Sequence, residues 1–138
     1  MNGTANGLYG GDLPNQINTP WIDFSEQSTI VGWSAYTTKR IRYKVVGNIV
    51  YVNLTLDGTS NSTSTTFTLP YIPKITSQGI ATLTSDNGAS TITGRFLLTA
   101  SDITVICSRP SSASSVTPTQ TWTASGNKII IGQFFYEI

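Results

Sequence analysis

An alternation of apolar and polar side chains over residues 40–57 constrains the fold of this chain more than any other feature. In the first half, Ile41, Tyr43 and Val45 alternate with Arg40, Arg42 and Lys44. In the second half, Ile49, Tyr51, Asn53 and Thr55 share one face of a strand, and Val50, Val52, Leu54 and Leu56 share the other. Between them, Gly47-Asn48 favours the positive φ angles of a two-residue turn. Residues 40–57 are therefore predicted to form an antiparallel β-hairpin.

Further β-prone segments recur along the chain, with turn sequences between them and almost no helical periodicity. The predicted strands outside the hairpin are 29–36, 65–69, 79–84, 90–98, 103–107, 119–123 and 128–138. A tally of about eight or nine strands, spaced by roughly 10 residues, is typical of a β-sandwich or jelly roll. A length of 138 residues fits one such domain. The sequence therefore predicts an all-β, antiparallel sandwich or jelly roll.

The last predicted strand, residues 128–138, is apolar at nearly every position. Its apolar residues are Ile129, Ile130, Ile131, Phe134, Phe135, Tyr136 and Ile138. A strand with two apolar faces is expected to be buried on both, either at the centre of a sandwich or at a subunit interface. Phe134, Tyr136 and Ile138 are therefore the candidate interface residues of a homotrimer.

Residues 1–20 differ in composition from the rest of the chain. They are rich in Gly and Asn, contain Pro14 and Pro20, and carry few apolar side chains. Such a segment cannot build a core of its own. We expect an extended arm over residues 1–20, held by a neighbouring subunit or another protein, and a β-domain over residues 21–138. The start has no signal-peptide pattern and no apolar run reaches membrane-helix length, so no membrane insertion is expected.

Charge is scarce. Charged residues make up 11% of the chain and the net charge is +1, against about 25% charged residues in an average domain. A nucleic-acid-binding function is not expected, because it requires basic clusters that neutralise phosphates. The one basic cluster, residues 39–44, is interpreted as the solvated face of a strand. The alternative is a patch for phosphate or an anionic sugar.

The residues that carry enzyme chemistry are mostly missing. The chain has no histidine and one cysteine, Cys107, which lies in an apolar run and is expected to be a buried hydrophobe. Its acids are scattered, and Asp23 and Glu26 do not stand out as a catalytic pair. The segment Asp86-Asn87-Gly88 fits a turn better than a calcium loop. We therefore expect no enzyme activity, no metal and no cofactor.

Aromatic side chains are the remaining candidates for ligand contact. Tyr and Trp rings can stack on sugar faces, although packing in the core is the alternative for each of them. The aromatic residues considered are Trp21, Trp33, Tyr36, Tyr71 and Trp122. The selected candidates are Trp122, Tyr71 and Trp33, together with Asn61 in a polar loop. Trp122 is expected to be the most exposed of them.

Several of these motifs together resemble a known module. They are Trp33-Ser34-Ala35-Tyr36, the segment 42–53 around Gly47-Asn48, the polar loop 56–62, and Phe67-Thr68-Leu69-Pro70. They resemble the C-terminal β-sandwich module of tailed-phage tail fibres, head fibres and minor structural proteins. The resemblance covers residues 20–75 well, and the ending 132–138 more loosely.

The resemblance implies a homotrimer on a virion surface, where it mediates attachment to a host receptor or glycan. It carries over no single receptor-binding residue. One alternative is a capsid decoration or structural virion protein, bound to other virion proteins through residues 1–20. A second alternative is a carbohydrate-binding module. The expected partners are thus other copies of the chain, virion proteins, and a glycan or protein of the host surface.

Overall fold

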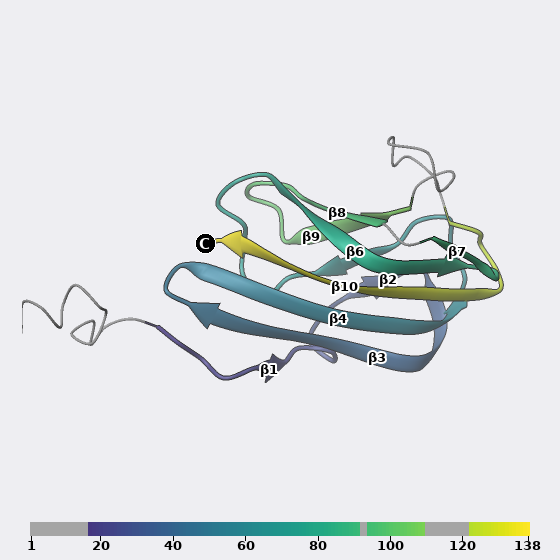
Figure 1. The fold of residues 1–138 in the computed structure, drawn as a ribbon, viewed down its shortest axis with the longest axis horizontal. Coiled ribbons are helices and arrows are strands. Elements are labelled where there is room, and N and C mark those ends of the chain that lie inside the picture. Colours follow the sequence, from purple (N-terminus) through teal and green to yellow (C-terminus); the bar gives the residue numbers. More distant parts are fainter. Residues whose placement is uncertain (1–16, 92–93, 110–121) are drawn as a thin grey trace, which may run out of the picture.

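A computed structural model describes residues 17–91, 94–109 and 122–138, and this part of the chain contains strands and turns but no helix (Figure 1). The strands are β1 (Ile22–Asp23), β2 (Ile30–Val31), β3 (Trp33–Val46), β4 (Ile49–Ser60), β5 (Thr66–Thr68), β6 (Ser77–Asp86), β7 (Ala89–Thr91), β8 (Gly94–Leu98), β9 (Thr104–Ser108) and β10 (Asn127–Glu137). They form one antiparallel sheet in the order β1-β3-β4-β10-β6-β8-β9-β5-β2, with β7 beside β6. The all-β, antiparallel prediction is confirmed.

The predicted hairpin is present as β3 and β4, and it is longer than the sequence indicated. The two strands pair from Val46↔Ile49 at the turn to Trp33↔Ser60 at the far end. Gly47 has a φ of 60°, a left-handed conformation that suits glycine at this tight turn. The predicted inner face of β4 is confirmed, since none of its four apolar side chains is more than 1% exposed: Val50, Val52, Leu54 and Leu56.

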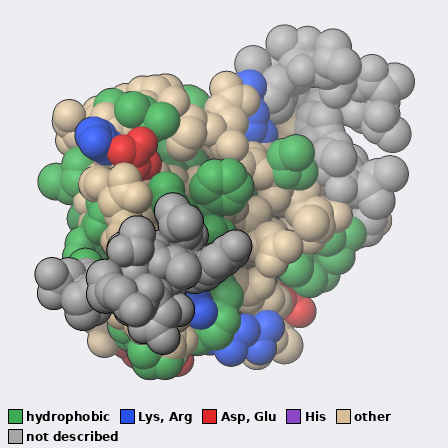
Figure 2. Space-filling view, turned by 60° about the vertical axis from the view of Figure 1, so that its left-hand side comes forward, with side chains coloured by type: hydrophobic (Ala, Val, Ile, Leu, Met, Phe, Trp, Pro, Cys, Tyr) green, Lys and Arg blue, Asp and Glu red, His purple; other side chains and the backbone are tan. Residues whose placement is uncertain are grey.

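Strand β10 lies at the centre of the sheet, between β4 and β6. Only one of its faces is buried: Phe134 is 6% exposed, whereas Phe135 is 64% exposed. The expected burial of both faces within one subunit is therefore wrong, because in the single chain the other face of the sheet is open to solvent; burial of that face at a subunit interface stays a prediction. Figure 2 shows one side of the molecule, where hydrophobic side chains remain on the surface among many uncharged polar ones.

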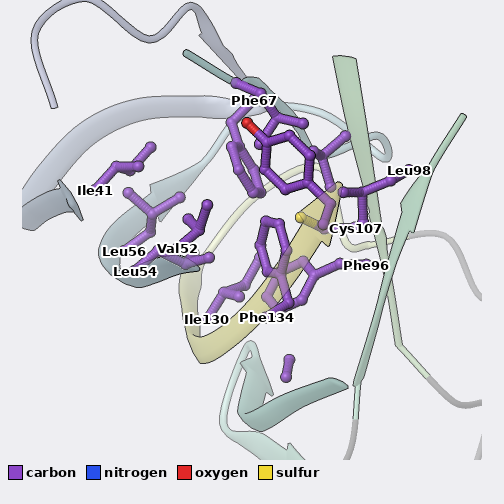
Figure 3. Close-up of a cluster of buried hydrophobic side chains, with 14 of the residues drawn as sticks. Ile41, Val52, Leu54, Leu56, Phe67, Phe96, Leu98, Cys107, Ile130 and Phe134 are labelled. Carbon is purple, nitrogen blue, oxygen red and sulfur yellow. The ribbon is translucent and has the colours of Figure 1, made fainter. Parts of the chain in front are cut away.

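The sheet is curled, so that strands distant in its order meet across the interior. Strands β10 and β5 are separated by β6, β8 and β9, which in a flat sheet would put them about 19 Å apart. The ring centroids of Phe134 and Phe67 are nevertheless 6.2 Å apart, and Phe96 contacts both at 5.1 and 6.0 Å. One continuous core therefore fills the concave side of the sheet (Figure 3).

Gly32 connects two strands that occupy distant places in the sheet. Strand β2 lies at one edge and β3 is second from the other edge, yet Gly32 is the only residue between them in sequence. Its φ of 103° is rarely adopted by residues with a side chain, and a Cβ atom here would collide with the carbonyl oxygen of Ser64. The chain thus turns at Gly32 from one part of the curled sheet to another.

Residues 17–19, at the end of the N-terminal segment, lie beside the end of β3. The amide of Thr19 donates to the carbonyl of Val45 at 2.9 Å, and Asn18 forms a bridge with Val46. Most of the predicted arm, and most of the predicted strand 119–123, lie outside the described residues. Trp122 and Thr123, which are described, are not part of a strand.

Candidate functional site

The residues predicted to contact a ligand lie in two separate places. Trp33 is 7% exposed and Trp122 is 2% exposed, so the expectation that Trp122 is exposed is wrong. Asn61 is exposed near Trp33, and its backbone N–H donates to the carbonyl of Gly32 at 3.2 Å. Tyr71 is 43% exposed, but it contacts Tyr43, about 30 Å further along β3. The structure therefore does not bring the four residues together.

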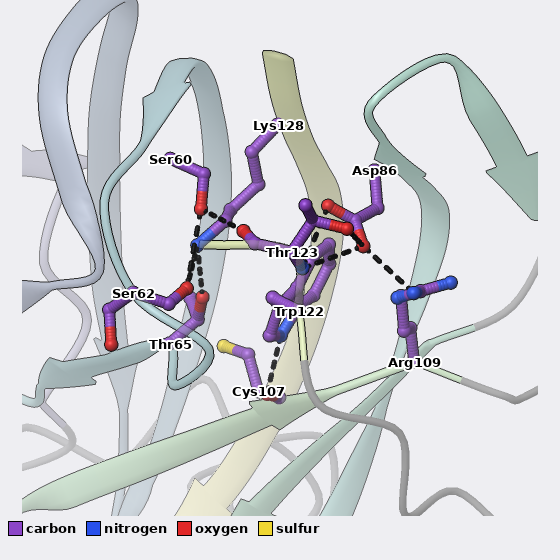
Figure 4. A network of polar contacts seen from close by, with 9 residues as sticks. All are labelled: Ser60, Ser62, Thr65, Asp86, Cys107, Arg109, Trp122, Thr123 and Lys128. Carbon is purple, nitrogen blue, oxygen red and sulfur yellow. Dashed lines mark hydrogen bonds and ion pairs between the residues drawn. The ribbon is translucent and has the colours of Figure 1, made fainter. Parts of the chain in front are cut away.

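A buried lysine explains why two tryptophans are in the interior. Lys128 on β10 is 0% exposed, and its ammonium group points into the end of the curled sheet (Figure 4). Its Nζ donates to the carbonyl of Gly32 at 2.8 Å, the Oγ1 of Thr65 at 2.9 Å and the carbonyl of Ser62 at 3.4 Å. These bonds compensate part of the cost of removing the charge from water.

Two indole rings complete the surroundings of this ammonium group. The Nζ of Lys128 lies 5.1 Å from the ring centre of Trp33 and 5.3 Å from that of Trp122, which is within range of a cation–π interaction. Burial lowers the pKa of Lys128 to about 8, while the nearby charge of Asp86 acts in the opposite direction. Trp33 and Trp122 are therefore packing partners of a buried charge, and their rings are not available to a ligand.

Asp86 forms the second charged centre of this region. Its carboxylate forms an ion pair with Arg109 at 2.8 Å. It also accepts hydrogen bonds from the backbone amide and the hydroxyl of Thr123 at 2.9 and 3.0 Å. Asp86 therefore joins Arg109 and Thr123, which are distant in sequence, to the end of β6. The sequence indicated a turn at Asp86 and gave no sign of this pairing, because the partners are distant in the chain.

The described residues support neither a reactive cysteine nor a metal site. Cys107 is 4% exposed, and burial raises the pKa of its thiol, which keeps it in the unreactive protonated form. Within residues 17–91, 94–109 and 122–138, no group of three or more Cys, Asp or Glu side chains is placed to hold a metal ion. The same part of the chain has no helix that could cross a membrane.

The strongest candidate site is a groove on the convex face of the sheet. It has a volume of about 600 Å³, within the range of small-molecule sites. Six of the residues that line it define the outer-face groove: Trp21, Tyr51, Gln78, Ile80, Gln133 and Phe135. The four apolar ones are well exposed: Trp21 46%, Tyr51 41%, Ile80 65% and Phe135 64%.

Strand pairing fixes the floor of the outer-face groove. Tyr51 on β4 is directly opposite Phe135 on β10, and their ring centroids are 5.9 Å apart. Gln133 is directly opposite Ile80 on β6, so an amide and an apolar side chain stand next to the aromatic pair. These residues belong to the central strands of the sheet, which hold them more rigidly than a loop does.

Trp21 forms one margin of the groove. It precedes β1, and its ring lies 5.5 Å from the guanidinium carbon of Arg42 on β3. Trp21 was considered from the sequence but is not among the selected candidates, and Tyr51 and Phe135 were not predicted as groove residues. The outward direction of Tyr51 was available from the hairpin pattern, whereas the exposure of Phe135 depends on the curl of the sheet.

The candidate interface residues Phe134, Tyr136 and Ile138 also need correction. Phe134 is 6% exposed and Tyr136 is 2% exposed in the single chain, where both belong to the core, and Ile138 packs against that core. Little of the first two side chains remains for contact with a second copy. They lie on the concave face of the sheet, which the chain fills with its own side chains.

Comparison with known proteins identified no relative. A scan against protein-family models, a search of curated proteins and a search of solved structures each found no match. The resemblance to phage modules therefore depends on the quoted motifs alone. Function has to be inferred from the chemistry of the groove.

Proposed function

We propose that this chain is a non-catalytic attachment module of a virion surface, and that it binds carbohydrate through the outer-face groove. The observation that carries the proposal is the exposed aromatic floor, made of Tyr51 and Phe135, with Trp21 at its margin. Exposed apolar side chains that gather in one concave place are typical of binding sites.

The groove has the two kinds of group that sugar recognition requires. Aromatic rings offer apolar area to the C–H face of a pyranose. The amides of Gln78 and Gln133 each offer donors and an acceptor, which match sugar hydroxyl groups. The oxygen of Gln78 already accepts from Arg95 at 3.3 Å, but a purely apolar partner would displace water from the remaining polar atoms of these amides without replacing its hydrogen bonds, and that carries a cost.

We also propose that the chain is a jelly-roll sandwich that forms a homotrimer. Its subunit interface would lie on another surface than Phe134, Tyr136 and Ile138. Val31 on β2 is directly opposite Thr66 on β5, which is directly opposite Ile106 on β9. Val31 and Ile106 are each 47% exposed, and this row carries no charge. Depletion of charge is typical of interface cores, so we propose that this row contacts a second copy.

The carbohydrate proposal is tested with a panel of immobilised neutral and acidic polysaccharides. Tyr51→Ala and Phe135→Ala are expected to weaken binding about 10-fold each, because a stacked aromatic contact contributes on the order of 1–2 kcal/mol. Tyr36→Ala is the matched control, since Tyr36 is 37% exposed and does not border the groove. A purely structural virion protein would bind none of the panel, and that result contradicts the proposal.

A further inference from the structure

The lining of the outer-face groove is uncharged. Among the described residues that line it, none is an acid, a lysine or an arginine. A carboxylate or sulfate group held against this lining would lose water without gaining an opposite charge there, and that is costly. Hydroxyl groups avoid this cost, because the side-chain amides of Gln78 and Gln133 can donate to them. The lining therefore fits a neutral ligand.

The aromatic side chains of the groove form a straight row across the strands. Tyr51 on β4 is directly opposite Phe135 on β10, and on its other side it is directly opposite Lys44 on β3. The register of β1 with β3 places Trp21, which directly precedes β1, beside Lys44. Lys44 itself is not among the residues that line the groove. Because paired residues line up perpendicular to antiparallel strands, the row runs across the sheet.

The row is long enough for several sugar rings. Strands β1 and β6 are separated by β3, β4 and β10, which puts them about 19 Å apart along the sheet. Ile80 on β6, directly opposite Gln133, continues the groove beyond Phe135. A single pyranose ring covers about one strand spacing of this length. One sugar would therefore leave most of the exposed apolar side chains in water.

The straightness of the row favours one kind of polymer. A pyranose ring with equatorial hydroxyl groups has flat C–H faces, and these faces stack on aromatic rings. Equatorial linkages keep successive rings in an extended ribbon, which can follow a straight row. Axial linkages turn the chain into a helix, which would leave the row after a few rings. The row therefore fits an extended polysaccharide.

We propose that the outer-face groove binds an internal segment of a neutral, linear polysaccharide with equatorial linkages, an inference that rests on the proposed carbohydrate function. The polymer lies across the strands, and its rings stack on Trp21, Tyr51 and Phe135. Its hydroxyl groups bind the amides of Gln78 and Gln133. Affinity comes from several contacts in a row, so it grows with the number of sugars until the row is filled.

The first test compares cellohexaose with maltohexaose, since both consist of glucose and differ in the geometry of the linkage. Binding of each to the full chain is measured by isothermal titration calorimetry, together with cellobiose and glucose. We expect cellohexaose to bind at least about 10-fold tighter than maltohexaose and than cellobiose, because each of these loses at least one stacked ring contact.

Trp21 reports whether the end of the row is occupied. It is 46% exposed, whereas the other two tryptophans, Trp33 and Trp122, are buried, so acrylamide quenches mainly the emission of Trp21. Cellohexaose should protect Trp21 from quenching, and cellobiose should protect it much less.

Trp21→Ala assigns the length dependence to this residue. The variant is expected to bind cellohexaose about 10-fold more weakly and cellobiose nearly unchanged, because Tyr51 and Phe135, with ring centroids 5.9 Å apart, can bind the disaccharide alone. Tyr36→Ala is the matched control, since Tyr36 does not line the groove. Thermal unfolding verifies that each variant remains folded.

A comparison of hydroxyethyl cellulose with carboxymethyl cellulose tests the charge, because the two polymers share one backbone. The neutral polymer should bind at least as tightly, and salt should have little effect on its binding. Tighter binding of the anionic polymer, lost in high salt, overturns the inference of a neutral ligand.

The remaining outcomes separate the two proposals. Equal binding of cellohexaose and maltohexaose, or binding of glucose as tight as that of cellohexaose, overturns the further inference and leaves the carbohydrate function standing. The same holds if cellohexaose does not bind while another polysaccharide of the panel does. Failure of every polysaccharide to bind overturns both.

Discussion

Lys128 shows how much a single residue depends on its surroundings in this protein. Its ammonium group is fully buried, contacts two carbonyl oxygens and one hydroxyl, and lies near two indole rings. The residue is ionised at neutral pH because its pKa, although lowered by burial, is about 8. Burial of this charge therefore reduces the stability of the folded state at neutral pH, and the reduction disappears when the proton is lost.

The stability of the chain should reflect this titration. The folded pKa of Lys128 is about 8 and the unfolded value is 10.5, so the unfolded state binds more protons between these pH values. The contribution of Lys128 to the free energy of unfolding should rise by about 3 kcal/mol from pH 8 to pH 10.5, at about 1.4 kcal/mol per pKa unit. Lys128→Met should lack this rise.

Urea unfolding of both proteins at several pH values measures the difference. The comparison with Lys128→Met removes the contribution of tyrosines, which are present in both proteins and titrate in the same range. A difference between the two proteins that stays constant from pH 7 to pH 10.5 would contradict the buried, titrating lysine.

Among the structural elements, β10 and the β2–β3 connection decide the shape of the sheet. β10 pairs with β4 along its whole length and with β6 along its first half, where the register shifts between Ile131 and Gly132. The β2–β3 connection turns within Gly32, which has no space for a side chain. Both features bend the sheet around its core and leave the face with Phe135 outside.

A substitution at Gly32 should therefore destabilise the fold strongly. Gly32→Ala is expected to cost 3 kcal/mol or more, roughly, because it combines a strained φ with a backbone collision. Gly47→Ala is the control, since its φ of 60° is also left-handed but its Cβ would meet open space. That variant should lose only about 1–2 kcal/mol. Equal losses in urea unfolding would show that Gly32 has no special role.

At the scale of the whole molecule, the curled sheet presents two outer surfaces of different chemistry. One carries the outer-face groove with its aromatic floor, and the other carries the uncharged row of Val31, Thr66 and Ile106. Separate surfaces allow a trimer to form through one while the other binds a ligand. Three grooves on one particle would also raise the avidity for a repetitive polymer.

The proposed trimer gives a prediction for size-exclusion chromatography with light scattering. The full chain should elute with the mass of three subunits, and Ile106→Asp should shift it to a monomer, because a charge at an interface core must be desolvated. Phe135→Asp is the matched control and should leave the mass unchanged. A compact monomer for the unmodified chain at micromolar concentration would reject the trimer.

Local sequence patterns were enough to predict the all-β class and the direction of many side chains. Alternation along residues 40–57 was enough to predict the hairpin and the buried face of β4, because the two-residue period of a strand is a local property. The burial of Cys107 followed in the same way from an apolar run. The outward position of Tyr51 was also contained in that pattern, although its use as a groove residue was not.

Which of these residues come together in the core, and which come together on the surface, depends on the pairing of distant segments. Trp122 lies beside a polar loop in sequence, yet it is buried beside Lys128, whose other partners come from residues 32–65. Phe135 belongs to a strand with two apolar faces, and the curl of the sheet covers only one of them. Such outcomes depend on pairings between distant segments, and local patterns in a sequence do not contain those pairings.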